Sequence, residues 1–272
     1  MPVIELTHGP VEYRRTAGDP DLAPLVFLHE GLGCVAMWAR FPDALARATG
    51  RSALIYSRHG YGGSGPARVP RPVTYMEEEA SRVLPELLDR LALDRPVLVG
   101  HSDGASIALL HASERPVAGL VLLAPHVFVE PETLAGVAAA GTSYRDGPLA
   151  RRLAGFHDDP DATFHSWADV WLSPAFREWN IEDRLPAIDD PVLVIQGEHD
   201  QYGTVRQLRA IEEGVGGPVR RVEIAECGHS PHLERPAETR EAVVRFLAPA
   251  GTDPGPGHPS LVAPATPGPV LS

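Results

Sequence analysis

Lysine is missing from this sequence, because each of its 24 basic residues is an arginine. A lysine amine is required for Schiff-base and pyridoxal chemistry and for the phosphate-binding P-loop, so these classes of function are excluded. Cysteine is scarce too: the chain has two, Cys34 and Cys227. Their spacing fits neither a metal site nor a disulfide framework, and we expect no bound metal.

Long apolar runs and an excess of positive charge are also lacking. No stretch approaches the apolar length that crosses a membrane, and residues 1–12 lack the pattern of a secretory signal. The formal net charge of −12 disfavours nucleic acid or an anionic membrane as a partner. We expect a soluble cytoplasmic protein that acts on a small-molecule substrate, and we leave open whether it forms a homodimer.

Short apolar runs alternate with stretches of helical spacing along most of the 272 residues. This alternation predicts βαβ units and an α/β fold, with a mostly parallel central sheet and helices on both faces. The expected strands lie at 3–15 (one or two edge strands), 25–28, 53–56, 96–99, 120–124, 192–195 and 219–224. The expected helices lie at 37–49, 75–93 (kinked at Pro85), 105–112, 205–213 and 236–247.

Residues 126–188 break this rhythm, because they carry no run of β-branched residues and show helical pieces at 132–140, 149–156 and 164–172. The pattern predicts a helical cap inserted into a core domain of residues 1–125 and 189–248. The proline-rich segment 249–272 cannot bury a core and is predicted to be disordered.

Three aromatic residues of the predicted cap, Phe164, Trp167 and Trp171, are candidates for lining a substrate pocket. Packing between the cap and the core is the competing interpretation for each of them. For the glycine-rich turn at 58–65, we prefer a structural role to substrate binding.

The motif with the clearest chemistry is Gly100-His101-Ser102-Asp103-Gly104. It follows an apolar strand and precedes a run of helix formers, which is the context of a nucleophile elbow. A serine on this turn is exposed at the head of a helix, where the backbone N–H groups favour negative charge. Ser102 is therefore the candidate nucleophile.

Two partners for Ser102 follow later strands of the predicted sheet. Asp200 comes soon after the strand at 192–195, and His229 follows the strand at 219–224. Because ligands bind beyond the carboxyl ends of parallel strands, the three side chains are expected to meet there. His229 would accept the serine proton, and Asp200 would fix the imidazole tautomer. Competing residues are His199 and His232 for the base, and for the acid Asp169, Asp183, Asp189 and Asp190.

The sequence resembles the α/β-hydrolase family over about residues 3–248. The resemblance rests on the loop at His29, the turn at Arg58, the Ser102 motif, Gly-x-x-Asp at 197–200 and Gly-His at 228–229. The chain order of serine, aspartate and histidine is the order of that family. The resemblance points to capped serine hydrolases of the esterase, lactonase and C–C hydrolase group, and it implies that no cofactor is needed.

The oxyanion hole needs two backbone N–H donors. Asp103, the residue after the serine, would supply one, and the loop after His29 the other. The family pattern points to Gly31, with Leu32 as the alternative, because Glu30 stands where the family usually has glycine.

We expect hydrolysis of a carboxylic ester or thioester through an acyl-Ser102 intermediate. Cleavage of a C–C bond or opening of a lactone by the same residues is an alternative. A non-catalytic receptor is less favoured, because such proteins usually lose a member of the triad. A lyase acting on cyanohydrins is weakened by the absence of lysine.

Overall fold

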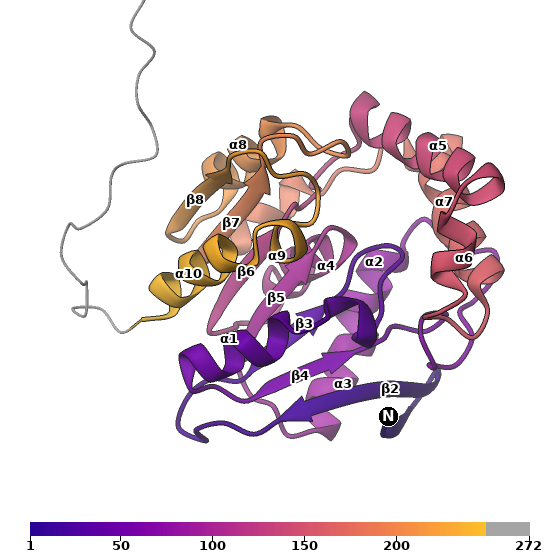
Figure 1. The fold of residues 1–272 in the computed structure, drawn as a ribbon. Coiled ribbons are helices and arrows are strands. Elements are labelled where there is room, and N and C mark those ends of the chain that lie inside the picture. The colour runs from indigo at the N-terminus through magenta and orange to yellow at the C-terminus, as the bar shows by residue number, and fades with distance from the viewer. Residues whose placement is uncertain (249–272) are drawn as a thin grey trace, which may run out of the picture.

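A computed structural model describes residues 1–248 of the chain. Its centre is an eight-stranded sheet with the order β1-β2-β4-β3-β5-β6-β7-β8 (Figure 1). The strands are β1 (Val3–Leu6), β2 (Gly9–Thr16), β3 (Leu25–Leu28), β4 (Ala53–Tyr56), β5 (Val97–His101), β6 (Gly119–Leu123), β7 (Val192–Gly197) and β8 (Val219–Ile224). The segment 249–272, predicted to be disordered, lies outside the described residues.

The sheet is parallel except at one edge, where β2 runs antiparallel to both β1 and β4. From β4 to β8 each neighbouring pair is parallel. The α/β fold with a mostly parallel sheet, predicted from the sequence, is confirmed. Because β3, β5, β7 and β8 are parallel, the loops that follow them meet at one edge of the sheet.

Helices cover both faces of the sheet, and side chains alternate between the two resulting cores. In β3, Val26 and Leu28 belong to one core, and Leu25 and Phe27 to the other. The first core receives η2 (Glu79–Val83), α2 (Tyr75–Glu78), α3 (Leu84–Arg90), α4 (Asp103–Ala112) and α8 (Val205–Gly214). The second receives η1 (Val35–Trp38), α1 (Phe41–Thr49) and α10 (Pro236–Leu247), while α9 (Pro231–Glu234) precedes α10.

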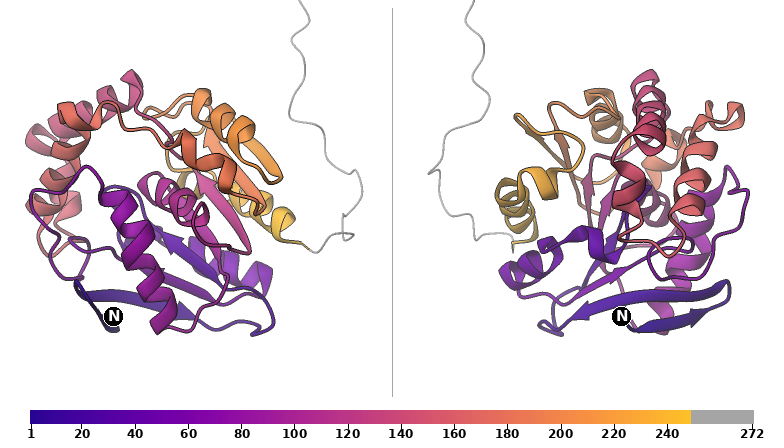
Figure 2. Two further views of the ribbon diagram at one scale, coloured as in Figure 1. Left: turned by 180° about the vertical axis from the view of Figure 1, so that it is seen from behind. Right: turned by 45° about the vertical axis from the view of Figure 1, so that its right-hand side comes forward.

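Between β6 and β7 the chain leaves the sheet and forms a group of helices at its side (Figures 1 and 2). These are α5 (Pro131–Asp146), α6 (Leu149–Leu153), α7 (Pro160–Leu172), η3 (Pro174–Phe176) and η4 (Glu182–Ala187). Val127 and Ile181 join the two ends of the insertion, because the Ile181 N–H donates to the Val127 carbonyl oxygen at 2.8 Å. The division into a core and a cap domain stays a prediction.

Prolines account for two differences from the expected helices. The expected helix at 37–49 is a 3₁₀ turn, η1, followed by α1, in which Pro42 occupies the first turn. The expected helix at 75–93 is three pieces, with the π-helical η2 just before Pro85. Proline has no N–H, and its ring crowds the carbonyl four residues earlier, so the regular hydrogen-bond ladder cannot pass through it.

None of the helices in residues 1–248 combines the length and the apolar character needed to cross a membrane.

Candidate active site

Ser102 stands at a strained turn between β5 and α4. Its φ of 52° and ψ of −118° are values that residues with a side chain rarely adopt. The Ser102 N–H donates to the Leu123 carbonyl oxygen at 2.9 Å, and the Ser102 carbonyl accepts the Ala105 N–H at 2.8 Å. The turn is therefore held from both sides, with the serine at the N-terminus of a helix.

The glycines flanking this turn are required by close packing. A Cβ atom on Gly100 would lie 2.5 Å from the Cα of Ala105, and one on Gly104 would lie 2.0 Å from the Leu28 carbonyl oxygen. Only glycine lets the start of α4 approach β3 and β5 this closely.

His229 and Asp200 form a hydrogen-bonded pair on the loops after β8 and β7. His229 Nδ1 lies 2.8 Å from Asp200 Oδ1 and 2.9 Å from Oδ2. A carboxylate only accepts hydrogen bonds, so Nδ1 carries the proton of the neutral ring. Nε2 is then the free acceptor, which is the tautomer that can take a proton from a hydroxyl group.

The Asp200 carboxylate receives two further donors. The Tyr202 N–H donates to Oδ1 at 2.8 Å, and Gln196 Nε2 donates to Oδ2 at 3.1 Å. Burial by itself would raise the pKa of Asp200, but the adjacent His229 and the hydrogen bond from the Tyr202 N–H lower it below the ordinary value. The aspartate is therefore held ionised and in one orientation.

Ser102 and His229 line a single cavity of about 190 Å³. Gly31, Leu32, Asp103, Trp167 and Trp171, all candidates from the sequence, also line it. Phe164 is not among its lining residues, since its ring stacks on Tyr144 with centroids 4.0 Å apart. Of the three aromatic candidates of the predicted cap, two therefore reach the cavity and one packs inside the helical group.

Within residues 1–248 no hydrogen bond joins the Ser102 hydroxyl to His229. Catalytic hydrogen bonds of this kind are often long or misaligned before the substrate binds, and they tighten in the complex. The structure thus brings the three predicted residues to one site and makes one of the two contacts that a triad needs.

The candidate oxyanion donors share a second property besides their position. The backbone N–H groups of Gly31, Leu32 and Asp103 make no hydrogen bond to any described residue. Unpaired backbone donors beside a cavity are uncommon, and they are what a developing oxyanion requires.

A buried arginine, Arg58, holds the His29 loop in place through hydrogen bonds. The Arg58 N–H donates to His29 Nε2 at 3.0 Å, and Arg58 Nη2 donates to the Glu30 carbonyl oxygen at 2.8 Å. Arg58 Nη1 also lies 3.7 Å from Asp103 Oδ2, between side chains that are both buried. The structural role that we prefer for the turn at 58–65 agrees with this arrangement.

The Asp103 side chain connects the nucleophile turn to α7. The Tyr75 hydroxyl donates to Asp103 Oδ2 at 2.6 Å, and Trp171 Nε1 donates to the Tyr75 oxygen at 3.0 Å. No sequence motif marks Tyr75, which lies in the first turn of α2.

His157, between α6 and α7, makes a second connection to the site. Its Nδ1 accepts the Gly62 N–H at 2.9 Å, so Nε2 carries the proton and donates to the Leu32 carbonyl oxygen at 2.9 Å. Burial lowers the pKa of His157, which keeps the ring in this neutral form.

Glu30 and His101 also line the cavity. The sequence places the negative charge of Glu30 near the site without deciding its role, and it gives no role to His101. His101 Nε2 lies 2.8 Å from the His229 carbonyl oxygen, and His101 Nδ1 lies 3.5 Å from Glu30 Oε2. His101 was missed because its motif was interpreted for its glycines and its serine.

The competing residues lie elsewhere. His232 packs between Trp38 and His101, with ring centroids 4.7 and 4.8 Å away. Burial holds the pKa of His232 well below its ordinary value. His199 is exposed. Three of the competing aspartates are exposed: Asp169, Asp183 and Asp189. The fourth, Asp190, accepts a hydrogen bond from the Val117 N–H.

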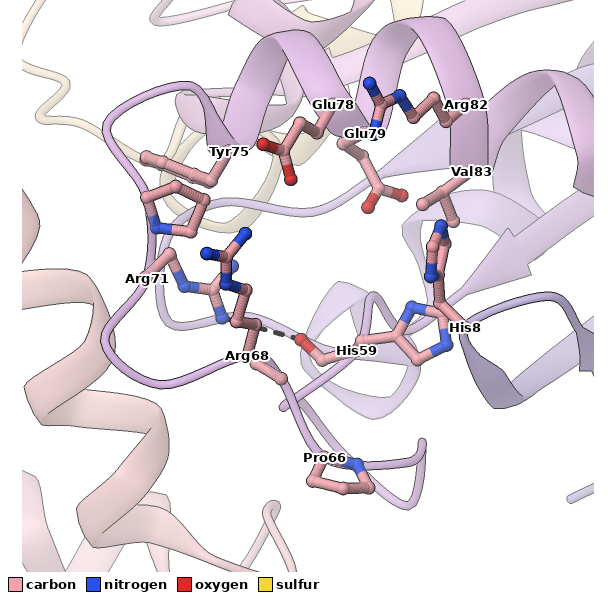
Figure 3. A pocket seen from close by; sticks show the side chains of 12 residues that line it. His8, His59, Pro66, Arg68, Arg71, Tyr75, Glu78, Glu79, Arg82 and Val83 are labelled. Atoms are coloured by element: carbon pink, nitrogen blue, oxygen red, sulfur yellow. Dashed lines mark hydrogen bonds between the residues drawn. The ribbon is translucent and has the colours of Figure 1, made fainter.

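A second cavity, of about 300 Å³, lies between the loop at 66–72 and the helical segment at 75–83 (Figure 3). Its carboxylates already have donors, since Thr74 donates to Glu78 and Tyr56 donates to Glu79. It contains none of the predicted catalytic residues. Among residues 1–248 no group of histidine, cysteine, aspartate or glutamate side chains is arranged to hold a metal ion.

The family model described as "Alpha/beta hydrolase family" matches residues 25–242. The chain belongs to this family. A proline iminopeptidase of Lactobacillus delbrueckii subsp. lactis is 28% identical over 278 aligned residues, which cover 86% of this chain and 94% of the relative.

An sn-1-specific diacylglycerol lipase of Mus musculus is 35% identical over 107 residues, covering 39% of this chain and only 33% of the lipase. The solved structure of an esterase from Exiguobacterium antarcticum superposes with a TM-score of 0.72 at 21% identity, covering 90% of this chain and 98% of the esterase. That likeness shows the fold. Together, the family and these relatives support hydrolase activity for this α/β-hydrolase.

Proposed function

We propose that this protein is a serine hydrolase that cleaves a carboxylic ester or thioester of a small molecule. The observation that carries the proposal is the Asp200–His229 hydrogen bond beside Ser102, in one cavity with unpaired N–H groups. The relatives include both a lipase and a peptidase, so the family alone does not select the ester bond.

In the proposed mechanism the Ser102 oxygen attacks the carbonyl carbon of the substrate while His229 Nε2 accepts the hydroxyl proton. The resulting oxyanion takes hydrogen bonds from the Asp103 N–H and from the Gly31 or Leu32 N–H. Collapse expels the alcohol or thiol, which receives the proton from His229. Water then repeats these steps on the acyl-serine and releases the acid.

Asp200 acts in this scheme by keeping the His229 ring in its orientation and stabilising the imidazolium that forms. Each oxyanion donor is expected to lower the barrier by about 3 kcal/mol. Trp167 and Trp171 supply the apolar wall of the pocket for the acyl or aromatic part of the substrate.

The first experiment combines fluorophosphonate labelling with hydrolysis of p-nitrophenyl acetate. Ser102→Ala is expected to abolish labelling and to reduce kcat/KM by about 10⁴-fold or more, because the nucleophile is lost. The matched control is Ser81→Ala, an exposed serine on η2, which should keep both activities. An S102A protein that hydrolysed the ester at the wild-type rate would refute the proposal.

A panel of aryl esters, thioesters, lactones, dienoates and aminoacyl arylamides then separates the reaction types. The highest kcat/KM is expected with an ester or thioester. A clear preference for a lactone, a dienoate or an arylamide would keep the proposed nucleophile and change the bond that it attacks.

A further inference from the structure

His101 has one ring nitrogen whose protonation is decided by its partner. Its Nε2 lies 2.8 Å from the His229 carbonyl oxygen, which can only accept, so Nε2 carries a proton. Nδ1 is buried and makes no hydrogen bond to a described residue. The oxygen that faces Nδ1 is Glu30 Oε2, at 3.5 Å.

A neutral His101 would therefore point an unprotonated nitrogen at a carboxylate oxygen. Both atoms would present lone pairs to each other in a buried site, which is unfavourable. The contact becomes attractive when a proton occupies Nδ1, which gives an imidazolium and a carboxylate.

Neither arginine near the pair binds the Glu30 carboxylate: Arg58 donates to the Glu30 carbonyl oxygen, and Arg152 lines the same cavity without an ion pair to Glu30. The other histidines around the pair do not supply this positive charge either. His232, on α9, faces His101 with ring centroids 4.8 Å apart, and burial holds its pKa well below the ordinary value. His126 faces His229 at 5.8 Å, and burial lowers its pKa to about 3. His29 is buried beside Arg58, and burial lowers its pKa as well. His229 itself is hydrogen-bonded to Asp200.

The Glu30 carboxyl group has no alternative partner among the described residues. Its side chain folds over Gly33, where a Cβ atom would lie 2.2 Å from Oε2, and it is 24% exposed. Burial would raise the pKa of Glu30, but the nearby His101 outweighs it and lowers that pKa below the ordinary range.

We propose that Glu30 and His101 form an ion pair, with His101 buried and Glu30 partly exposed, that holds the His29 loop and the loop after β8 together and leaves the site with no net charge from these two residues. The pair is a positioning device for the reaction that we propose above, and its mechanistic part rests on that function. Glu30 precedes the oxyanion donors in the chain, and His101 precedes the nucleophile. Through the His229 carbonyl the pair also reaches the base.

Variants that remove one or both charges of the Glu30–His101 pair test the proposal. His101→Gln keeps an amide donor for the His229 carbonyl but leaves the Glu30 charge uncompensated, which stabilises the protonated form of His229. In H101Q the acid limb of the plot of kcat/KM against pH should move to higher pH by about one unit, with KM little changed. The double variant Glu30→Gln/His101→Gln is neutral again, and its acid limb should return to the wild-type position.

The single variant Glu30→Gln provides an independent check, because glutamine is close to glutamate in shape. In this variant the glutamine amide can donate a hydrogen bond to an unprotonated His101 Nδ1, so the local charge stays zero and the acid limb of the pH profile should not move. The control is His199→Gln, an exposed histidine near Asp200, which should leave the profile unchanged.

A measurement without turnover separates this inference from the proposed function. In wild-type protein labelled with ¹⁵N-histidine, the NMR signals of His101 should show both ring nitrogens protonated at pH 7.5, and Nδ1 should be unprotonated in E30Q. A neutral His101 in the wild type would overturn the ion pair even if the enzyme hydrolyses esters. The role of the ion pair in the reaction would be overturned by either of two results. One is a pH profile of kcat/KM for H101Q that superimposes on the wild-type profile. The other is a shifted acid limb that remains shifted in the double variant.

Discussion

The two halves of the candidate site differ in how completely their hydrogen bonds are made. On the imidazole side, the Asp200 carboxylate accepts donors from His229, Tyr202 and Gln196. On the opposite side, the N–H groups of Gly31 and Asp103 have no partner among the described residues. One half is finished before substrate arrives, and the other keeps its donors free for a charge that develops only during the reaction.

This contrast separates two tasks of an active site. Orientation of a base needs fixed contacts, because an imidazole in the wrong tautomer cannot accept the serine proton. Stabilisation of an oxyanion needs donors that are held in place by other atoms. Arg58 serves this purpose by binding the Glu30 carbonyl, and Tyr75 does so by binding the Asp103 side chain.

The largest loss of activity should come from disrupting the hydrogen-bonded Asp200–His229 side of the site. Asp200→Asn replaces the carboxylate with an amide that can favour the wrong tautomer of His229, and kcat should fall by about 10³- to 10⁴-fold. The control in the same region is Glu234→Gln, because Glu234 binds the N–H groups of Gly228 and Ser230 outside the triad. It should change kcat only a few-fold, and an equal loss in both variants would contradict the orienting role of Asp200.

A smaller loss of activity is expected from disturbing the side with the free N–H groups. A Cβ atom on Gly31 would lie 2.0 Å from Trp167 Nε1, so Gly31→Ala must displace either the indole or the loop with its N–H groups. Misplacement of about 1 Å can cost about 100-fold in rate, and kcat/KM for p-nitrophenyl acetate should fall by about that factor.

Two variants sharpen this prediction. Gly141→Ala, at a helical position with room for a Cβ atom, should keep wild-type activity. Adding Trp167→Ala to G31A removes the ring that causes the clash and should restore part of the rate. Unchanged activity in G31A would mean that this loop does not shape the oxyanion donors.

The smallest effect concerns stability in acid. Burial lowers the pKa of His126 from 6.5 to about 3, so between these values the unfolded chain binds a proton that the folded chain refuses. As the pH is lowered below about 6.5, the free energy of unfolding should therefore decrease, and this residue should contribute up to about 1.4 kcal/mol per pH unit.

Urea unfolding at several pH values between 7.5 and 4.5 measures this slope. His126→Phe should make the slope shallower, and His199→Gln, which replaces an exposed histidine, should not. Because burial also lowers the pKa of His29 and His232, part of the slope should remain in H126F. An unchanged slope in H126F would show that His126 takes up its proton without unfolding.

The sequence predicts the sheet well, because the short apolar runs at 25–28 and 192–195 have one favourable arrangement, that of strands buried on both faces. It also predicts that Ser102, Asp200 and His229 meet, because each follows a parallel strand. It does not predict the links through Tyr75 and His157, since each pairs residues far apart in the chain. Phe164 was a plausible pocket residue by composition, and the packing of Tyr144 against it could not be foreseen.

His157 gives the helical insertion a direct influence on the reacting end of the pocket. The uncharged ring accepts a hydrogen bond from the Gly62 N–H and donates one to the Leu32 carbonyl oxygen, so it joins three separate segments of the chain. The segment between α6 and α7 is thereby tied to the Leu32 backbone, next to the oxyanion donors. A displacement of these helices would therefore be passed to the oxyanion donors through a single imidazole.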